Sequence, residues 1–296
     1  MQPMQKRILL IKIALVVIVT LVFIALLERQ LWWRLLFTQK YLFYLFTTVL
    51  AIAFLYLKNV SSLVRTITLL LSFVLFGILF SIHPSPLCAF TKSFIHYLSR
   101  GFVPPPMIVM AGIMILFTVA GNKVFCGWIC PLGSLQEVIY TLSRLIKKFK
   151  IPFFITNATR FSFIAVFLIF AYGFRINIYN LFNPFEFFHW QLQRYILIVL
   201  SMVLLASIWY YRPYCQFICP AGLITWIFEQ MSLFKICKNQ EKCTRCNKCL
   251  KESPCTAIDG IIQDHTVTPD CFACGKCIES CPENALSFSL RPRLRG

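Results

Sequence analysis

Charged side chains are scarce in this chain of 296 residues. They make up 14% of it, against about 25% in a soluble domain, and only 11 are Asp or Glu. Apolar residues reach 58%, and the mean hydropathy is +0.73. This composition excludes a soluble globular enzyme and a disordered chain, because neither has so much apolar surface and so little charge. It predicts an integral membrane protein.

The few charges and the 14 cysteines are unevenly distributed. Residues 1–234 contain 19 Lys and Arg but only 4 Asp and Glu, whereas residues 235–296 contain 10 and 7, together with nine Cys. We therefore expect a transmembrane helical domain over 1–234 and a small cysteine-rich domain over 235–296. The formal net charge is +18, but the cations flank apolar runs instead of forming a basic face. The expected partner of the body is the lipid bilayer and not nucleic acid.

Six apolar segments are candidates for membrane-spanning helices, since a span needs about 20 apolar residues. They cover about Ile8–Leu27, Tyr41–Leu57, Val64–Ile82, Pro106–Ala120, Phe161–Tyr172 and Tyr195–Trp209. The first has Lys6 and Arg7 before it, like a signal peptide. Its run is long, however, and no small-residue cleavage site follows it, so we interpret it as an anchor. The sequence predicts an all-α polytopic membrane protein of about six transmembrane helices.

The cations between these segments predict the orientation. Twelve Lys and Arg fall on the side that holds the N-terminus and seven on the other side. Cytoplasmic loops carry the excess of Lys and Arg, so the N-terminus and the tail are expected in the cytoplasm. The predicted location is a bacterial-type inner (cytoplasmic) membrane, crossed several times. A reducing cytoplasm also suits air-sensitive clusters.

The tail contains the most specific motif. Its spacing, Cys-x2-Cys-x2-Cys-x3-Cys-Pro, is that of bacterial ferredoxins. The residues are Cys271, Cys274, Cys277, Cys281 and Pro282. Three closely spaced thiolates bind one [4Fe-4S] cluster, and the fourth reaches a second cluster. We therefore expect a two-cluster ferredoxin-like α+β domain at the C-terminal end.

A second run begins 28 residues upstream and departs from the usual spacing. It consists of Cys243, Cys246 and Cys249, and its fourth member, Cys255, comes after five residues and lacks the following Pro. We interpret this departure as a loop insertion. If the fourth Cys of each run binds the cluster of the other run, two ligand sets result. One cluster is expected on Cys243, Cys246, Cys249 and Cys281, and the other on Cys271, Cys274, Cys277 and Cys255. Zinc is the alternative metal, but zinc sites rarely use this spacing. The reducing compartment argues against disulfides.

The chain contains an internal repeat, whose two copies are Lys123–Arg144 and Arg212–Leu233. Each copy has a cation before the first Cys, then Cys-x3-Cys-Pro, a Gly two residues after the Pro, and an apolar stretch. Pro131 and Pro220 suit the first turn of a helix. We expect the cysteines at the inner membrane surface: Cys126, Cys130, Cys215 and Cys219. Three interpretations stay open, namely a third [4Fe-4S] cluster, redox-active or partner-contacting thiols, and small cysteines packed between helix ends.

The other cysteines and the histidines give weaker signals. Cys88 and Cys237 are expected to be small hydrophobes. Haem is not favoured, because its ligands must face each other across helices and these His lie near loop ends. His83 and His189 are candidate quinone contacts, since a quinone site needs polar groups beside an apolar pocket. His189 also follows the pattern of an interfacial belt residue beside Trp190.

Two segments carry a family resemblance. FCGWICPLG at Phe125–Gly133 and YCQFICPAG at Tyr214–Gly222 resemble the paired Cys-x3-Cys-Pro motifs of NapH/NosR-type membrane polyferredoxins. The tail resembles their two-cluster domain, and the likeness covers about Ala111–Ser287. The resemblance implies membrane electron transfer, often from quinol, through iron–sulfur partners. A NapH-like architecture is expected, since no covalent-flavin domain of the NosR kind precedes the spans.

The leading hypothesis is a membrane-bound iron–sulfur protein that relays electrons from quinol to a redox partner through two [4Fe-4S] clusters. It would be a subunit of a quinol dehydrogenase, and no residue of the chain is assigned a catalytic role. A transmembrane relay to a periplasmic flavoprotein or oxidoreductase is an alternative, although the strong cofactor motifs lie on one side of a core about 30 Å thick. The other alternative is a reductase for the assembly or maturation of a metal centre.

Overall fold

The computed structural model describes residues 34–58, 60–80, 84–143, 145–265 and 267–290. The chain divides into two compact units, one up to Leu50 and one from Ala51 onward. In the first unit the structure describes part of α2 (Arg34–Tyr56). The predicted anchor at Ile8–Leu27 and the candidate quinone contact His83 lie outside the described residues.

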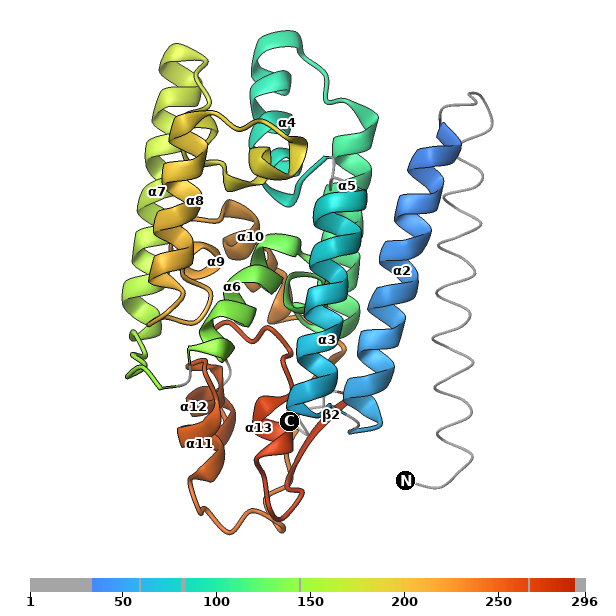
Figure 1. The fold of residues 1–296 in the computed structure, drawn as a ribbon, viewed down its shortest axis with the longest axis vertical. Helices are drawn as coiled ribbons and strands as arrows, with labels where there is room; N and C mark the ends of the chain where they lie inside the picture. Colours follow the sequence, from blue (N-terminus) through green and yellow to red (C-terminus); the bar gives the residue numbers. More distant parts are fainter. Residues whose placement is uncertain (1–33, 59, 81–83, 144, 266, 291–296) are drawn as a thin grey trace. The chain divides into compact units, whose positions relative to one another are not determined.

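Helices dominate residues 51–290 (Figure 1). In chain order they are α3 (Ser62–Ser72), η1 (Phe73–Leu79), α4 (Pro86–Arg100), α5 (Pro105–Gly121), η2 (Phe125–Ile129), α6 (Pro131–Leu142), α7 (Phe153–Phe174), η3 (Ile178–Phe182), η4 (Pro184–His189), α8 (Arg194–Ala206), α9 (Pro213–Phe217) and α10 (Pro220–Glu229). The mostly helical architecture agrees with the expectation from the sequence.

Helix α4 has no counterpart among the predicted segments. Ser85 caps it by accepting a hydrogen bond from the Cys88 N–H at 3.2 Å, and Gly101 ends it with a φ of 74°. Only Gly adopts this left-handed conformation without strain. The helix is amphipathic, and Lys92 and Arg100 interrupt its apolar residues. A search for long apolar runs therefore misses it.

Two helical stretches are long and apolar enough to cross a membrane, namely Ser62–Leu79 and Phe153–Phe174. Three of the other predicted segments are shorter apolar helices, Tyr41–Tyr56, Pro105–Gly121 and Arg194–Ala206. On α7, large apolar side chains such as Phe154 and Ile169 are exposed. A bundle of about six spans therefore stays a prediction.

Helices α6 and α10 lie inside the helical bundle. Each begins at the Pro that follows the second Cys of its repeat, which confirms the predicted helix starts at Pro131 and Pro220. Helix α6 packs on α3 and α8, while α10 packs on α4, α5 and α7. Figure 1 shows both helices between α4 at one end and the tail at the other. The expected position of the repeat cysteines at the inner membrane surface stays a prediction.

The tail combines a small sheet with short helices. Strand β1 (Phe234–Lys238) pairs antiparallel with β2 (Leu286–Leu290), and Phe234 and Phe288 stack at 5.9 Å between their ring centroids. Between the strands lie α11 (Lys248–Glu252), α12 (Ala257–Ile262) and α13 (Lys276–Glu279). The tail and the helices from residue 51 belong to one compact unit. The domain division at residue 234 stays a prediction.

Candidate metal centres

The first predicted ligand set comes together in the tail. Its four thiols, which we call the outer tail set, line a single small cavity: Cys243, Cys246, Cys249 and Cys281. Cys249 is buried and Cys246 is exposed. The loop between these cysteines curls because Arg245 and Asn247 adopt left-handed conformations. The main-chain N–H of Ala285 donates to the Cys281 sulfur at 3.3 Å, and hydrogen bonds of this kind tune iron–sulfur clusters.

The second predicted set, the inner tail set, consists of Cys271, Cys274, Cys277 and Cys255. The first three are buried, and Cys255 comes from the turn before α12. The charge of Cys274 acts on Cys255, and the charge of Cys255 acts on Cys271 and Cys277. The inserted residues therefore leave Cys255 beside the other three thiols. Burial raises the pKa of Cys255 to about 12, so its thiolate form needs a metal to compensate the charge.

In the described part of the chain, no three His, Cys, Asp or Glu side chains gather closely enough to hold a single metal ion. A [4Fe-4S] cluster makes a different demand, because each thiolate binds a separate iron at a separate corner of the cube. Each tail set supplies four cysteine sulfurs, which is the number of thiolates that such a cluster requires.

The loop of the inner tail set packs directly on the first repeat. The main-chain carbonyl oxygen of Phe272 lies where a Cβ on Gly127 would be only 2.0 Å away. The indole N–H of Trp128 donates to the carbonyl of Ala273 at 2.9 Å. Gly127 and Trp128 stand between the two cysteines of the first repeat, and Phe272 and Ala273 stand between Cys271 and Cys274. The two cysteine motifs are therefore in direct contact.

A buried carboxylate links α3, α6 and the second repeat. Glu137 of α6 accepts hydrogen bonds from Arg65 of α3 at 2.5 and 3.0 Å, and from Arg212 at 2.7 and 2.9 Å. The hydroxyl of Tyr211 also donates to Glu137, at 2.6 Å. Both guanidinium groups donate to the carbonyl of Gly127, at 3.0 and 2.7 Å. Because a buried charge is tolerated only when it is paired, this network holds Gly127 in place.

A second buried network fixes the inner tail loop. Asp270, the residue before Cys271, pairs with Lys123 and with Arg160 of α7, the latter at 2.6 Å. Glu229 of α10 accepts a hydrogen bond from the Cys271 N–H at 2.9 Å. The charges of Lys123 and Arg160 lower the pKa of Asp270 despite its burial. The Asp270 network attaches the tail to the bundle by ion pairs. Lys123 and Arg212 also lie over the Phe272 ring, at 5.4 and 5.0 Å from its centroid.

Sequence reasoning missed the acidic members of these networks. Residues 1–234 hold only four acids, and two of them are Glu137 and Glu229. An acid in so apolar a segment is expensive and usually has a specific partner, so its rarity was an available signal. Asp270 gave no such signal, because acids are common in the tail.

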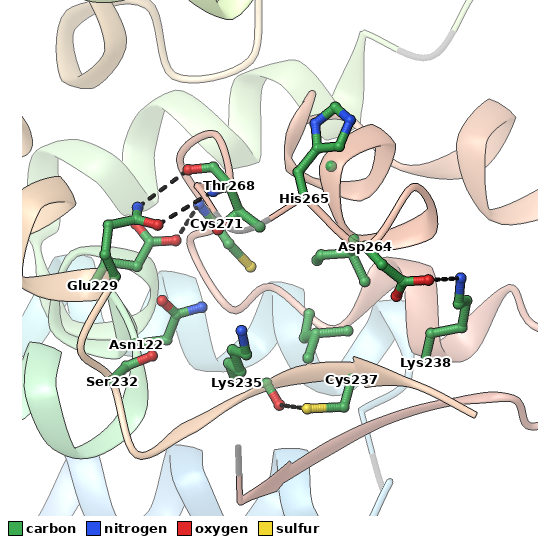
Figure 2. A pocket seen from close by; sticks show the side chains of 14 residues that line it. Asn122, Glu229, Ser232, Lys235, Cys237, Lys238, Asp264, His265, Thr268 and Cys271 are labelled. Atoms are coloured by element: carbon green, nitrogen blue, oxygen red, sulfur yellow. Dashed lines mark hydrogen bonds and ion pairs between the residues drawn. The ribbon is translucent and has the colours of Figure 1, made fainter. Parts of the chain in front are cut away.

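A cavity of about 180 Å³ lies beside the inner tail set (Figure 2). Cys271 lines it together with Asn122, Glu229 and Ser232. Among the described residues, the Asn122 Oδ1 and Ser232 Oγ atoms are buried without hydrogen-bond partners. On the opposite wall, the Cys237 sulfur contacts the carbonyl of Lys235 at 3.6 Å. Cys237 thus belongs to β1 and to this wall.

Of the described histidines, His265 lines the same cavity as Cys271, and the other two belong to α4 and η4. His189 contacts Glu186 at 3.3 Å, and Lys92 of α4 donates to Glu186 at 3.2 Å. The hydrogen bond with His189 and the charge of Lys92 lower the pKa of Glu186 to about 2. His96 is half-buried on α4, and His265 is exposed in the tail. Cys88 is buried near Lys92, in the same part of α4.

Comparison with known proteins adds a family. A family model described as a 4Fe-4S binding domain matches residues 103–150 and 194–236, which contain both repeats. The protein YccM of Escherichia coli is 31% identical over 57% of this chain, and the match spans 52% of YccM, about half its length. MJ0749, an uncharacterized protein of Methanocaldococcus jannaschii, is 30% identical over 62% of this chain and 70% of its own. No solved structure matches the chain.

The ferredoxin-type protein NapH of Escherichia coli is 23% identical over 66% of this chain and 72% of its own. The matching 4Fe-4S binding domain and these relatives indicate a ferredoxin-type protein that binds iron–sulfur clusters. The chain belongs to the NapH/NosR family of ferredoxin-type proteins.

Proposed function

We propose that this protein is a membrane-bound relay that passes electrons from quinol to a redox partner through two [4Fe-4S] clusters in its tail. The outer tail set would hold one cluster and the inner tail set the other. The observation that carries the proposal is the contact between Phe272 and Gly127. It attaches the inner ligand loop to the apolar helical bundle, so electrons that enter through the bundle have a short path to the tail.

The exposed apolar side chains of α7 support the membrane location. Phe154, Ile169 and Phe174 are 81%, 65% and 66% exposed, on a helix of 22 residues that is long enough to span a bilayer. In water so large an apolar face would favour aggregation, whereas in lipid it is the expected surface. The redox centres would then lie beside and within a membrane helix bundle.

His189 supports a quinol contact at the end of the bundle away from the tail. Its side chain is 13% exposed and contacts Glu186, which in turn pairs with Lys92. A quinol needs a group that accepts a hydroxyl proton and polar neighbours that orient its ring, and this triad offers both. Electrons released there would travel through the bundle to the inner tail set.

A basic groove supports a redox partner of negative charge. A cavity of about 670 Å³ lies over the tail beside α11 and α13. Its lining contains five lysines: Lys148, Lys150, Lys248, Lys251 and Lys276. We call this surface the lysine groove. An acidic partner would be attracted to it over long distance, which raises the association rate.

The position of the repeat cysteines favours one second candidate, a relay across the membrane. The repeat cysteines come just before α6 and α10, and Figure 1 shows these two helices between the tail and α4. A redox group there would divide the crossing of an about 30 Å core into shorter steps. The acceptor in that case would be an oxidoreductase on the far side.

The test uses the full chain in sealed vesicles, with a soluble quinol analogue as donor and the visible absorbance of the iron–sulfur clusters as readout. Addition of the quinol analogue should bleach the clusters, and Cys274→Ser should reduce the bleaching while Cys237→Ser should not. A wild-type protein with fully loaded clusters that the quinol analogue does not reduce would contradict a quinol donor.

A further inference from the structure

The four repeat cysteines come from two copies of one motif that interlock inside the bundle. In each copy the second cysteine directly precedes the Pro that starts a helix of the bundle, Cys130 before α6 and Cys219 before α10. All four side chains are buried, with exposed fractions of 9, 6, 7 and 7% for Cys126, Cys130, Cys215 and Cys219. We call these four residues the bundle set.

Each copy is held by the cation and the helix of the other. Arg212 of the second copy donates to the carbonyls of Cys126 and Gly127 in the first copy. Lys123 of the first copy donates to the carbonyl of Gly222 in the second, at 2.9 Å. The contacts between the two copies are thus reciprocal, and they bring the four cysteines close together.

Residues further along α6 and α10 also contact the opposite copy of the repeat. Gln136, the fifth residue after Pro131, donates to the Cys215 sulfur at 3.6 Å and accepts from the Tyr214 N–H at 3.0 Å. Thr225, the fifth residue after Pro220, interacts through its side chain with Cys126. Each pair of the four thiols is close enough for the charge on one sulfur to affect the other.

Main-chain N–H groups and cations surround these buried sulfurs. Main-chain N–H groups at the start of α6 and α10, from Gly133 and Gly222, donate to Cys130 and Cys219. The positive charges of Lys123 and Arg212 both act on Cys126 and Cys215. Cysteines that serve only as apolar packing need neither N–H donors nor cations, whereas buried thiolates need both.

Two glycines make this close packing feasible. A Cβ on Gly133 would lie 3.0 Å from the Cys126 carbonyl oxygen, and a Cβ on Gly222 would lie 2.6 Å from the Cys215 carbonyl oxygen. Both glycines stand two residues after the Pro of their copy. The repeated Gly therefore allows each helix start to fold back on the first cysteine of its own copy.

From this arrangement we infer that the bundle set binds a third [4Fe-4S] cluster, which exchanges single electrons with the cluster of the inner tail set. Four thiolates are the number that such a cluster requires, and its iron supplies the charge that makes their burial favourable. This inference builds on the proposed function, because it places a third member in the same relay.

The transfer involves no bond to a substrate. One electron leaves the reduced cluster of the inner tail set and reduces the oxidised cluster of the bundle set, or moves in the opposite direction, and no proton or atom is transferred. Gly127 directly follows Cys126, and Phe272 directly follows Cys271. Their contact therefore joins the two ligand loops. At the far side, Cys219 and Cys88 both lie near Tyr214, so the bundle set also approaches α4.

The first test measures iron and acid-labile sulfide per chain in anaerobically purified full-length protein. The wild type should hold about twelve iron atoms, and replacement of all four bundle cysteines by Ser should leave about eight. The double variant Cys88→Ser/Cys237→Ser is the matched control and should keep about twelve. About eight iron atoms in the wild type and in the bundle variant would overturn the third cluster and leave the proposed function intact.

A second measurement does not depend on the folding of the variant. A stepwise reductive titration of the wild type should consume three electrons per chain, because each of the three clusters accepts one. Two electrons per chain would overturn the third cluster. Failure of the proposed function looks different: Cys246→Ser/Cys274→Ser would then leave the iron content unchanged, whereas two tail clusters predict a loss of about eight iron atoms per chain.

Discussion

The carbonyl oxygen of Phe272 fills the space that a side chain on Gly127 would need. A Cβ at Gly127 would lie 2.0 Å from that oxygen and 3.1 Å from the carbonyl carbon. No real contact is so short, so only Gly fits at this position. This contact joins a residue of the first repeat to a residue of the ferredoxin motif. The neighbouring hydrogen bond, from Trp128 to Ala273, links residues 145 positions apart in the sequence.

Gly127→Ala should therefore separate the inner tail loop from the bundle. We expect a loss of about 1–3 kcal/mol in the free energy of unfolding, as for other overpacked sites. We also expect faster bleaching of the tail clusters in air, because the loosened loop admits oxygen. Gly112→Ala is the control, since a Cβ there meets nothing within 4 Å. The contact would have no structural importance if both variants melted and bleached alike.

Cys255 should be the fourth ligand of the inner tail set in spite of its unusual spacing. Cys255→Ser should remove or destabilise one cluster, which corresponds to about four iron atoms per chain. Cys237→Ser should leave the iron content unchanged, because the Cys237 sulfur lies against a carbonyl in β1. Iron analysis with electron paramagnetic resonance of the reduced protein distinguishes the two variants. An unchanged spectrum for Cys255→Ser would mean that another group completes the set.

Glu137 should be among the most sensitive side chains of the bundle. Glu137→Gln leaves Arg65 and Arg212 buried without a counter-charge, and we expect a cost of about 3–5 kcal/mol. Asp264→Asn breaks an ion pair with Lys238 at 2.6 Å, but Asp264 is half exposed, so its effect should stay below about 1 kcal/mol. Thermal denaturation in detergent measures both. Equal melting temperatures for the two variants would exclude a structural role for the buried network.

The lysine groove should govern the rate at which an acidic partner docks. Lys248→Glu/Lys251→Glu should slow electron transfer to an acidic ferredoxin or similar acceptor by at least about tenfold at low salt, because the attraction is reversed. The difference from wild type should shrink as salt rises, since exposed charges are screened. Stopped-flow kinetics at several salt concentrations provide the measurement. A rate that is independent of both the substitution and salt would place the docking surface elsewhere.

Several features of the fold could be predicted from the sequence because they depend on local chemistry. Pro131 and Pro220 start helices since Pro suits the first helical turn. The ferredoxin spacing identifies the tail because three thiolates must reach one cluster from a short loop. Cys255 could be assigned to a set only as a hypothesis, since the insertion before it changes a distance that depends on three-dimensional folding.

Other features depend on contacts between distant segments and gave no local signal. The depth of α6 and α10 in the bundle follows from the exchange of Arg212 and Lys123 between the two repeats. The importance of Gly127 follows from Phe272, which comes from the far end of the chain. Helix α4 was missed because its apolar face is interrupted by charges that find partners elsewhere, as Lys92 does at Glu186.

Electron transfer through the tail is tested most directly by electron paramagnetic resonance on the full-length protein, purified without air and reduced, with all four bundle cysteines replaced by Ser. This variant should show two reduced [4Fe-4S] signals that interact magnetically, and it should hold about eight iron atoms per chain. One signal should be lost on adding Cys246→Ser and the other on adding Cys274→Ser. A protein that folds but contains zinc, or shows no reducible cluster signal, would contradict electron transfer through the tail.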